Sequence, residues 1–98
     1  MVKNDIIDEL KKHEPELRQK GVNHVALFGS YARGQQRPFS DIDILIELNP
    51  NDEIDIFSYV ALKEQIANFF GCPVDFVHKA ALKKEVRGYV EKEMTYAF

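Results

Sequence analysis

Apolar residues near the N-terminus recur at the spacing of a helix, between charged positions. They are Ile6, Ile7, Leu10 and Leu17. This period predicts an amphipathic helix that begins at about Lys3. Pro15 should break or kink the helix near His13, because proline lacks the amide donor and its ring clashes with the preceding turn. We expect Gly21 to end the segment.

Two short apolar runs, separated by a glycine-containing segment, predict the first two strands. Residues 25–28 form the first run, which stops at residues 29–30. Residues 31–33 are typical of a helical turn closed by Gly34, and a loop follows. The second strand should start near Asp41, because apolar residues then occupy every second position, as on a strand with one buried face. That face is expected to contain Ile42, Ile44, Ile46 and Leu48.

The second half of the chain alternates between helix and strand. Turn-forming residues make 49–52 a loop, and the spacing predicts a helix over 56–70, a strand over 74–77 and a further helix from Leu82. The tail, 94–98, is compatible with a helix end or with a short edge strand. This order indicates an α/β (α+β) fold, a compact two-layer domain with a small mixed sheet flanked by helices. The chain of 98 residues suits a single domain throughout.

The predicted helix over 56–70 carries more apolar surface than a surface helix needs. Its apolar side covers roughly 180°, whereas a stripe of ~100° is enough to pack on a core. Phe57 lies outside even this wide side. A small sheet covers only part of such a surface, so two explanations remain open. Either a partner buries the remainder, or the terminal helices or the C-terminal tail cover it.

Composition and charge narrow the function classes. The formal net charge is −3, so strong direct nucleic-acid binding is not expected of a chain without a basic excess. Cys72 is the only cysteine, which excludes an internal disulfide and a cysteine zinc cluster and favours a reducing cytoplasm. No apolar stretch approaches about 18 residues, and the N-terminus lacks the apolar core of a signal peptide. Neither a membrane span nor a signal peptide is therefore expected.

Acidic residues on the second and third strands are the first candidates for chemistry. Asp41 and Asp43 are two residues apart, so both side chains point to one side of the strand, opposite the isoleucines. Carboxylates this close repel each other unless a divalent cation makes both charges favourable. The alternative is a solvated strand face, to which Glu47 also belongs. Asp75 stands alone in an apolar strand, where a buried charge costs several kcal/mol unless it is paired or metal-bound. If the two strands are neighbours, Asp75 joins the same cluster.

Gly29 and Ser30 stand where the first strand ends and a helical turn begins. Amides at such a turn hold phosphate oxygens, glycine permits close approach to the backbone, and a serine hydroxyl adds a donor. The alternative, an N-cap serine after a turn glycine, leaves the neighbouring Asp41 and Asp43 unexplained. Together, the turn and the three carboxylates predict a nucleoside triphosphate site with two Mg²⁺ ions, which clamp the attacking and leaving oxygens of an in-line displacement.

Three segments together resemble a known signature: GSYARG at 29–34, SDID at 40–43 and VDFV at 74–77. The signature is that of the polymerase-β-type nucleotidyltransferase superfamily. The short chain is similar to its minimal branch, the MNT-domain proteins, which are commonly antitoxins encoded beside a HEPN-domain toxin. The resemblance extends from about Ile6 to the C-terminal helix. Phe39 departs from it, since the loop before the Ser-Asp pair is usually polar, and a lid or a partner contact would explain this residue.

The resemblance implies a role for each motif residue. Gly29 and Ser30 would bind the triphosphate of ATP, and Asp41 and Asp43 would hold both Mg²⁺ ions. Asp75 would complete the ion that activates the acceptor hydroxyl, with a further possible role as general base. The implied reaction moves AMP from ATP to tyrosine hydroxyls of the cognate HEPN toxin, blocks its RNase activity and releases pyrophosphate.

Two basic features admit more than one interpretation. Arg33 matches the arginine of the family, as a phosphate contact or as the partner in an ion pair that supports the acidic strand. A basic run follows the third strand and comprises Lys79, Lys83, Lys84 and Arg87. A solvated helix face is the default explanation for the run, and contact with nucleotide phosphates or with an acidic partner is the alternative.

Two further functions stay open beside protein adenylylation. One is a non-catalytic binding module that neutralises its partner by occlusion and retains only the nucleotide fold. The other is nucleotidyl transfer to a small molecule such as an antibiotic, for which related enzymes usually carry an additional acceptor domain. A chain of this size has room for the nucleotide site alone, which favours a macromolecular acceptor.

Overall fold

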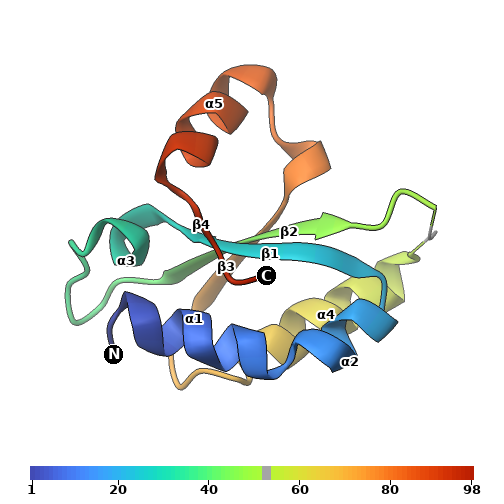
Figure 1. Ribbon diagram of the computed structural model, residues 1–98, viewed down its shortest axis with the longest axis horizontal. Coiled ribbons are helices and arrows are strands. Elements are labelled where there is room, and N and C mark those ends of the chain that lie inside the picture. Colours follow the sequence, from blue (N-terminus) through green and yellow to red (C-terminus); the bar gives the residue numbers. More distant parts are fainter. Residues whose placement is uncertain (52–53) are drawn as a thin grey trace.

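Among the residues that the structure describes, 1–51 and 54–98 of a computed structural model, four strands form one mixed sheet (Figure 1). The strands are β1 (Val22–Phe28), β2 (Ile42–Leu48), β3 (Val74–His78) and β4 (Thr95–Tyr96). Their order across the sheet is β3-β2-β1-β4. β1 runs antiparallel to β2 and to β4, whereas β3 runs parallel to β2. A parallel pair needs a crossover connection, and a helix supplies it here.

Helices cover both faces of this sheet. They are α1 (Lys3–Lys12), α2 (Glu14–Gln19), α3 (Gly29–Arg33), α4 (Ile56–Ala67) and α5 (Lys84–Glu93), with a 3-10 turn, η1 (Lys79–Ala81), before α5. Figure 1 shows α1, α2 and α4 together on one face and α5 on the other. α4 is the crossover between β2 and β3. The predicted α/β fold is confirmed. In the described part of the chain, no helix is both long and apolar enough to cross a bilayer.

The isoleucines of β2 form the centre of the main core. Ile42, Ile44 and Ile46 are fully buried, as their alternation predicted, and Leu48 packs at the edge of the same cluster. They contact apolar residues of the three helices on this face, among them Ile6, Leu10, Leu17, Leu62 and Ile66. The opposite face holds a smaller cluster that includes Ala26, Leu45 and Val90. A central strand with both faces covered explains why β2 is apolar almost throughout.

The N-terminal helix breaks where proline predicted a break. α1 ends at Lys12, and α2 starts at Glu14 with Pro15 in its first turn, where a missing amide donor costs nothing. Two other boundaries differ from the prediction by three residues each. β1 begins at Val22 rather than at residue 25, and α4 ends at Ala67 rather than at residue 70.

The C-terminal tail forms an edge strand, so the helix-end alternative is wrong. Leu27 and Ala26 of β1 pair with Thr95 and Tyr96 of β4. The loop predicted over 49–52 is a turn as far as residue 51, and residue 52 lies outside the described residues.

The wide apolar surface of α4 is covered over only half of the helix. Leu62 and Ile66 are buried against the main core. At the N-terminal end, Ile56, Phe57 and Val60 are 69%, 83% and 44% exposed. Cover by the chain's own elements is therefore confirmed for one half only, and burial of the other half by a partner stays a prediction. The chain's own elements cover the C-terminal half, and the N-terminal half is apolar surface open to solvent.

Candidate active site

Asp43 and Asp75 lie opposite each other at the start of the parallel pair β2–β3. The strand register pairs them directly, so both side chains project from the same face of the sheet, on backbones about 4.8 Å apart. Asp41 lies immediately before β2, two residues from Asp43, and points to the same side. The structure thus brings the three predicted carboxylates to one end of the sheet.

The prediction that Asp75 is a buried charge is wrong. Asp75 is exposed, Val74 and Val77 are partly buried against the two core clusters, and Phe76 alone of these residues is buried. The reason is that β3 is an edge strand, which an apolar run does not reveal. A solvated carboxylate needs no partner, so the link between Asp75 and the other two acids depends on strand register instead.

Gly29 lies directly against Asp43. Phe28, the last residue of β1, is the register partner of Asp43, so the turn that follows β1 begins beside the carboxylate. Gly29 has φ 74°, and a Cβ on it would stand 2.8 Å from Asp43 Cγ and would collide with the carboxylate. Two separate conditions therefore require glycine here: the left-handed backbone and the lack of space.

The turn after Gly29 is short. α3 has five residues and ends at Gly34, which adopts the left-handed conformation at φ 69°. Ser30 stands in its first turn and is half-buried. A single helical turn has little dipole, so its unpaired amides are what this turn offers an anion, rather than the charge of a helix end.

Arg33 is held by two residues that the sequence did not indicate. Its Nη1 donates to Oε2 of Glu93 at 2.9 Å, and its Nε donates to Oε1 of Gln35 at 3.1 Å. Glu93 is the last residue of α5, so this ion pair joins α5 to the turn beside the carboxylates. Among the described residues, Arg33 forms no hydrogen bond or ion pair with the acidic strand. A separation of 60 residues leaves no periodic signal by which Glu93 could have been predicted.

The carboxylates lie close enough to perturb each other. Burial raises the pKa of Asp43, and the negative charges of Asp75 and Asp41 raise this pKa further, while the positive charge of Arg33 lowers it. The ionised form of Asp43 is therefore less favourable in the protein alone than it is in the unfolded chain. A cation between the carboxylates would remove this penalty.

The acids do not form a ready-made metal cage. Within residues 1–51 and 54–98, no group of three His, Cys, Asp or Glu side chains is arranged to hold an ion by itself. Mg²⁺ is commonly held by one or two protein carboxylates together with phosphate oxygens of the substrate. The arrangement of Asp41, Asp43 and Asp75 fits an ion that arrives with a nucleotide, and does not fit a structural ion.

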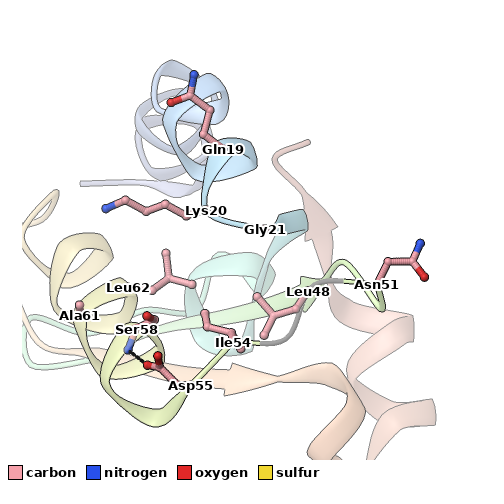
Figure 2. Close-up of a pocket in the computed structure, with 10 residues that line it drawn as sticks. All are labelled: Gln19, Lys20, Gly21, Leu48, Asn51, Ile54, Asp55, Ser58, Ala61 and Leu62. Atoms are coloured by element: carbon pink, nitrogen blue, oxygen red, sulfur yellow. Dashed lines mark hydrogen bonds between the residues drawn. The ribbon is translucent and has the colours of Figure 1, made fainter.

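A cavity of about 540 Å³, shown in Figure 2, has none of these carboxylates in its lining. It lies between the end of α2 and the start of α4, and its lining comprises Gln19, Lys20, Gly21, Leu48, Asn51, Ile54, Asp55, Ser58, Ala61 and Leu62. Figure 2 shows the hydrogen bond from Ser58 N to Asp55 Oδ1 at its edge, which caps α4. Leu48 ends β2, whereas Asp43 stands near its start, so this cavity is not the site that the motifs predicted.

The basic run after β3 also lies at the far end of the sheet. Lys79 follows His78, which pairs with Ile46 near the end of β2, and its Nζ lies 3.4 Å from both Glu47 and Glu91. This lysine is neutralised by the chain's own carboxylates. The structure thus gives no support to contact between Lys79 and the phosphates of a nucleotide bound at Gly29.

Comparison with known proteins agrees with the motif. Residues 10–97 match the family described as the nucleotidyltransferase domain. Protein adenylyltransferase MntA of Thermococcus cleftensis is 36% identical over 89 residues, which cover 89% of this chain and 87% of the relative.

Two solved structures share the fold. A toxin–antitoxin crystal structure with AMP-PNP matches with a TM-score of 0.70 and 25% identity, over 100% of this chain and 73% of the other. The structure of a tri-AMPylated HEPN toxin of Shewanella oneidensis with its MNT antitoxin matches with a TM-score of 0.67 and 20% identity, over 99% and 72% of the two chains. The family match confirms the resemblance read from the motifs at 29–34 and 40–43: this chain belongs to the nucleotidyltransferase domain family and is an enzyme of that family.

Proposed function

We propose that this chain is a Mg²⁺-dependent protein adenylyltransferase that transfers AMP from ATP to tyrosine hydroxyls of a HEPN-domain toxin and thereby neutralises it. The relative that is named protein adenylyltransferase MntA supports the reaction class. The toxin–antitoxin structure with AMP-PNP supports an ATP-like substrate and a toxin partner. A single cysteine, Cys72, cannot form an internal disulfide, as is typical of proteins in a reducing compartment, and this is consistent with action in the cytoplasm.

One observation carries the proposal. The register that pairs Asp43 with Asp75, and the contact of Gly29 with Asp43, put the proposed phosphate-binding turn and the carboxylates at one point of the fold. An N-cap serine or a solvated strand face would need neither contact. A nucleotidyltransferase needs both, because the phosphates and the metal-binding oxygens act on the same phosphorus atom.

The proposed roles follow from this placement. Gly29 and Ser30 bind the β- and γ-phosphates through backbone amides and the serine hydroxyl. Asp41 and Asp43 would hold Mg²⁺ together with phosphate oxygens, and Asp75 would add a further carboxylate ligand. When bound, the metal stabilises the negative charge that develops on the transferred phosphoryl group. Arg33 contacts phosphate, since its guanidinium lies close enough to Asp43 to lower the pKa of that carboxyl.

The transfer balances as a single displacement. The acceptor hydroxyl oxygen attacks the α-phosphorus of ATP and forms a phosphodiester bond. The bond between the α-phosphorus and the bridging oxygen breaks, and pyrophosphate leaves. The phenolic proton passes to Asp75, the most exposed position of the β-strand carboxylates and therefore the one that an incoming acceptor reaches.

Mass spectrometry of the partner tests the proposal. A candidate HEPN-domain partner is incubated with the chain and Mg-ATP, and its intact mass is compared before and after. We expect increments of whole AMP units with the unchanged chain and none with Asp43→Asn. Asp8→Asn, a change of the same chemistry on the exposed side of α1, is the control and should retain the increments.

An RNase assay of the partner, run beside the mass measurement, tests the occlusion alternative. If Asp43→Asn still suppresses the RNase activity of the partner while the unchanged chain adds no mass, the chain neutralises by binding alone. The adenylyltransferase proposal would then be wrong.

A further inference from the structure

β3 leaves one side of its backbone unpaired beside the carboxylates. It is the last strand in the sheet order and pairs only with β2. Ile42 N donates to Pro73 O at 3.0 Å, which sets the phase of the parallel ladder. Residues 73, 75 and 77 bond to β2, so Val74, Phe76 and His78 direct their N–H and C=O groups outward. Within the described ranges, none of the backbone hydrogen bonds of turns, loops and caps involves these groups, whereas the carbonyl of His78 accepts the first hydrogen bond of the 3-10 turn η1.

An exposed strand edge of this kind binds another extended polypeptide segment. Its donors and acceptors alternate at the spacing of a strand, and another extended polypeptide is what matches that row. Proteins usually blunt a free edge with lysine, proline, a bulge or a very short strand. The opposite edge, β4, has two residues, whereas β3 has five and contains neither lysine nor proline. The acidic residue of β3 is Asp75, which belongs to the motif VDFV at 74–77.

The position of Asp75 links the edge to the reaction. On a strand added beside β3, the residue opposite Asp75 would have its Cβ about 4.5–5.5 Å away and would point to the same face of the sheet. Asp43 lies one strand further in, at about 10 Å from the added backbone. A serine hydroxyl lies only about 2.4 Å from its own Cα, whereas a tyrosine hydroxyl lies roughly 6.5 Å away and extends toward both carboxylates. The geometry thus favours a long hydroxyl-bearing side chain.

We propose that the acceptor protein docks an extended segment on the outer edge of β3, with the tyrosine to be modified opposite Asp75. This inference rests on the proposed function and adds how the acceptor is bound. Backbone pairing supplies the docking, so the register of the added strand selects which side chain meets Asp75. A second copy of this chain is a poorer occupant, since edge-to-edge pairing of two β3 strands would bring two clusters of three carboxylates together.

Residue-resolved amide hydrogen exchange of the chain, alone and in complex with the HEPN-domain protein, tests the docking. In the chain alone, the amides of Asp75 and Val77 should be protected by β2, while those of Phe76 and His78 exchange quickly. In the complex without ATP, we expect exchange at Phe76 and His78 to slow at least ten-fold, as paired amides do. Unchanged exchange at both would overturn the proposal. Protection that appears in the chain alone and rises with its concentration would also overturn it, in favour of self-pairing.

A pair of variants at His78 tests the same contact through the reaction. His78→Pro removes an outward N–H and adds a ring at the edge, and the native φ of −91° lies near the range of proline. His78→Ala removes the same side chain, including its contact with Tyr59, and keeps the N–H. We expect kcat/KM for the protein acceptor to be about ten-fold lower in His78→Pro than in His78→Ala, given one lost hydrogen bond and the blocked edge. Equal values in two folded variants would contradict docking at this edge.

The two proposals fail in different ways. Slow exchange at Phe76 and His78 without any AMP increment would retain the docking edge and end the enzymatic proposal. AMP increments with unchanged exchange would retain the enzyme and end the docking proposal.

Discussion

The turn that begins at Gly29 is packed against the carboxylate of Asp43, so close that no side chain fits between them. This contact fixes the distance between the proposed phosphate-binding amides and the proposed metal ligand through the backbone of β1 and β2. A site built on two hydrogen-bonded strands is more precise than one built on loops.

Replacing Gly29 with alanine should abolish Mg-ATP binding, because the new Cβ collides with Asp43. Gly34→Ala is the matched control. Gly34 also has a positive φ, 69°, but nothing lies within 4 Å of its Cβ position. The Gly34→Ala variant should be destabilised only by the left-handed backbone conformation, which would lower the free energy of unfolding by about 1–2 kcal/mol. Isothermal titration with Mg-ATP and urea unfolding of both variants measure the difference. Equal nucleotide affinity in the two would contradict the role assigned to Gly29.

The raised pKa of Asp43 predicts a stability that depends on pH. A carboxyl whose pKa is higher in the folded state than its unfolded value of 3.8 favours folding when protonated. Its contribution is fully present below 3.8 and is lost as the pH rises through the raised pKa. Asp43→Asn should therefore raise the melting temperature of the metal-free chain at pH 7, and the gain should vanish below about pH 3.8.

Asp55→Asn serves as the control of opposite sign. The hydrogen bond from the Ser58 amide lowers the pKa of Asp55. The ionised carboxylate of Asp55 therefore stabilises the fold above pH 3.8, the unfolded pKa, and this stabilisation is lost as the pH falls through the lowered pKa. Thermal unfolding of both variants and the unchanged chain between pH 3 and 7 tests the two signs. If Asp43→Asn instead lowers the melting temperature at pH 7, then burial and the neighbouring acids do not outweigh Arg33 in setting the pKa of Asp43.

Strand and helix assignments were largely predictable because each depends on local periodicity. The isoleucines of β2 alternate, and Pro15 marks a helix boundary by its own covalent geometry. Asp75 was expected to join Asp41 and Asp43 only if β2 and β3 are neighbours, and these two strands do pair in the fold. The motif residues could be named because Gly29, Asp41 and Asp43 are close in sequence, which makes the signature local.

Exposure and long-range pairing were not predictable. Val74–Val77 is as apolar as a central strand, yet β3 lies at an edge, so the burial of Asp75 was predicted wrongly. Strand order depends on the packing of the whole chain and leaves no mark on a four-residue run. The partner of Arg33 was missed for the same reason, since Glu93 meets it only through the folded position of α5.

The pair of Arg33 and Glu93 should contribute little to stability. Their side chains are 42% and 38% exposed, and such pairs typically contribute about 0.2–1 kcal/mol. A double-mutant cycle with Arg33→Ala and Glu93→Ala should give a coupling in this range that weakens as salt is added. For Mg-ATP affinity we expect a several-fold loss with Arg33→Ala and little change with Glu93→Ala. Equal losses would indicate that the ion pair itself, rather than a phosphate contact of Arg33, supports the site.

Phe39 is an exposed aromatic residue two positions before Asp41. It is 96% exposed and stands in a turn closed by Arg37 N to Ser40 Oγ at 2.8 Å and Ser40 N to Arg37 O at 3.0 Å. An aromatic ring held in water two residues from Asp41 gains nothing for folding, which favours the partner-contact interpretation. Phe39→Ser should change the unfolding free energy by no more than about 0.5 kcal/mol and should raise KM for the protein acceptor several-fold, with KM for ATP unchanged.

Phe57→Ser is the comparison for this variant, because it removes a second exposed phenylalanine, 83% exposed, from the start of α4. That position lies by Leu48, at the opposite end of β2 from Asp43. If both variants raise the acceptor KM equally, the cause is general loss of apolar surface, and Phe39 has no special place at the site. A rise in the KM for ATP with Phe39→Ser alone would instead show that the ring covers the nucleotide, as a lid would.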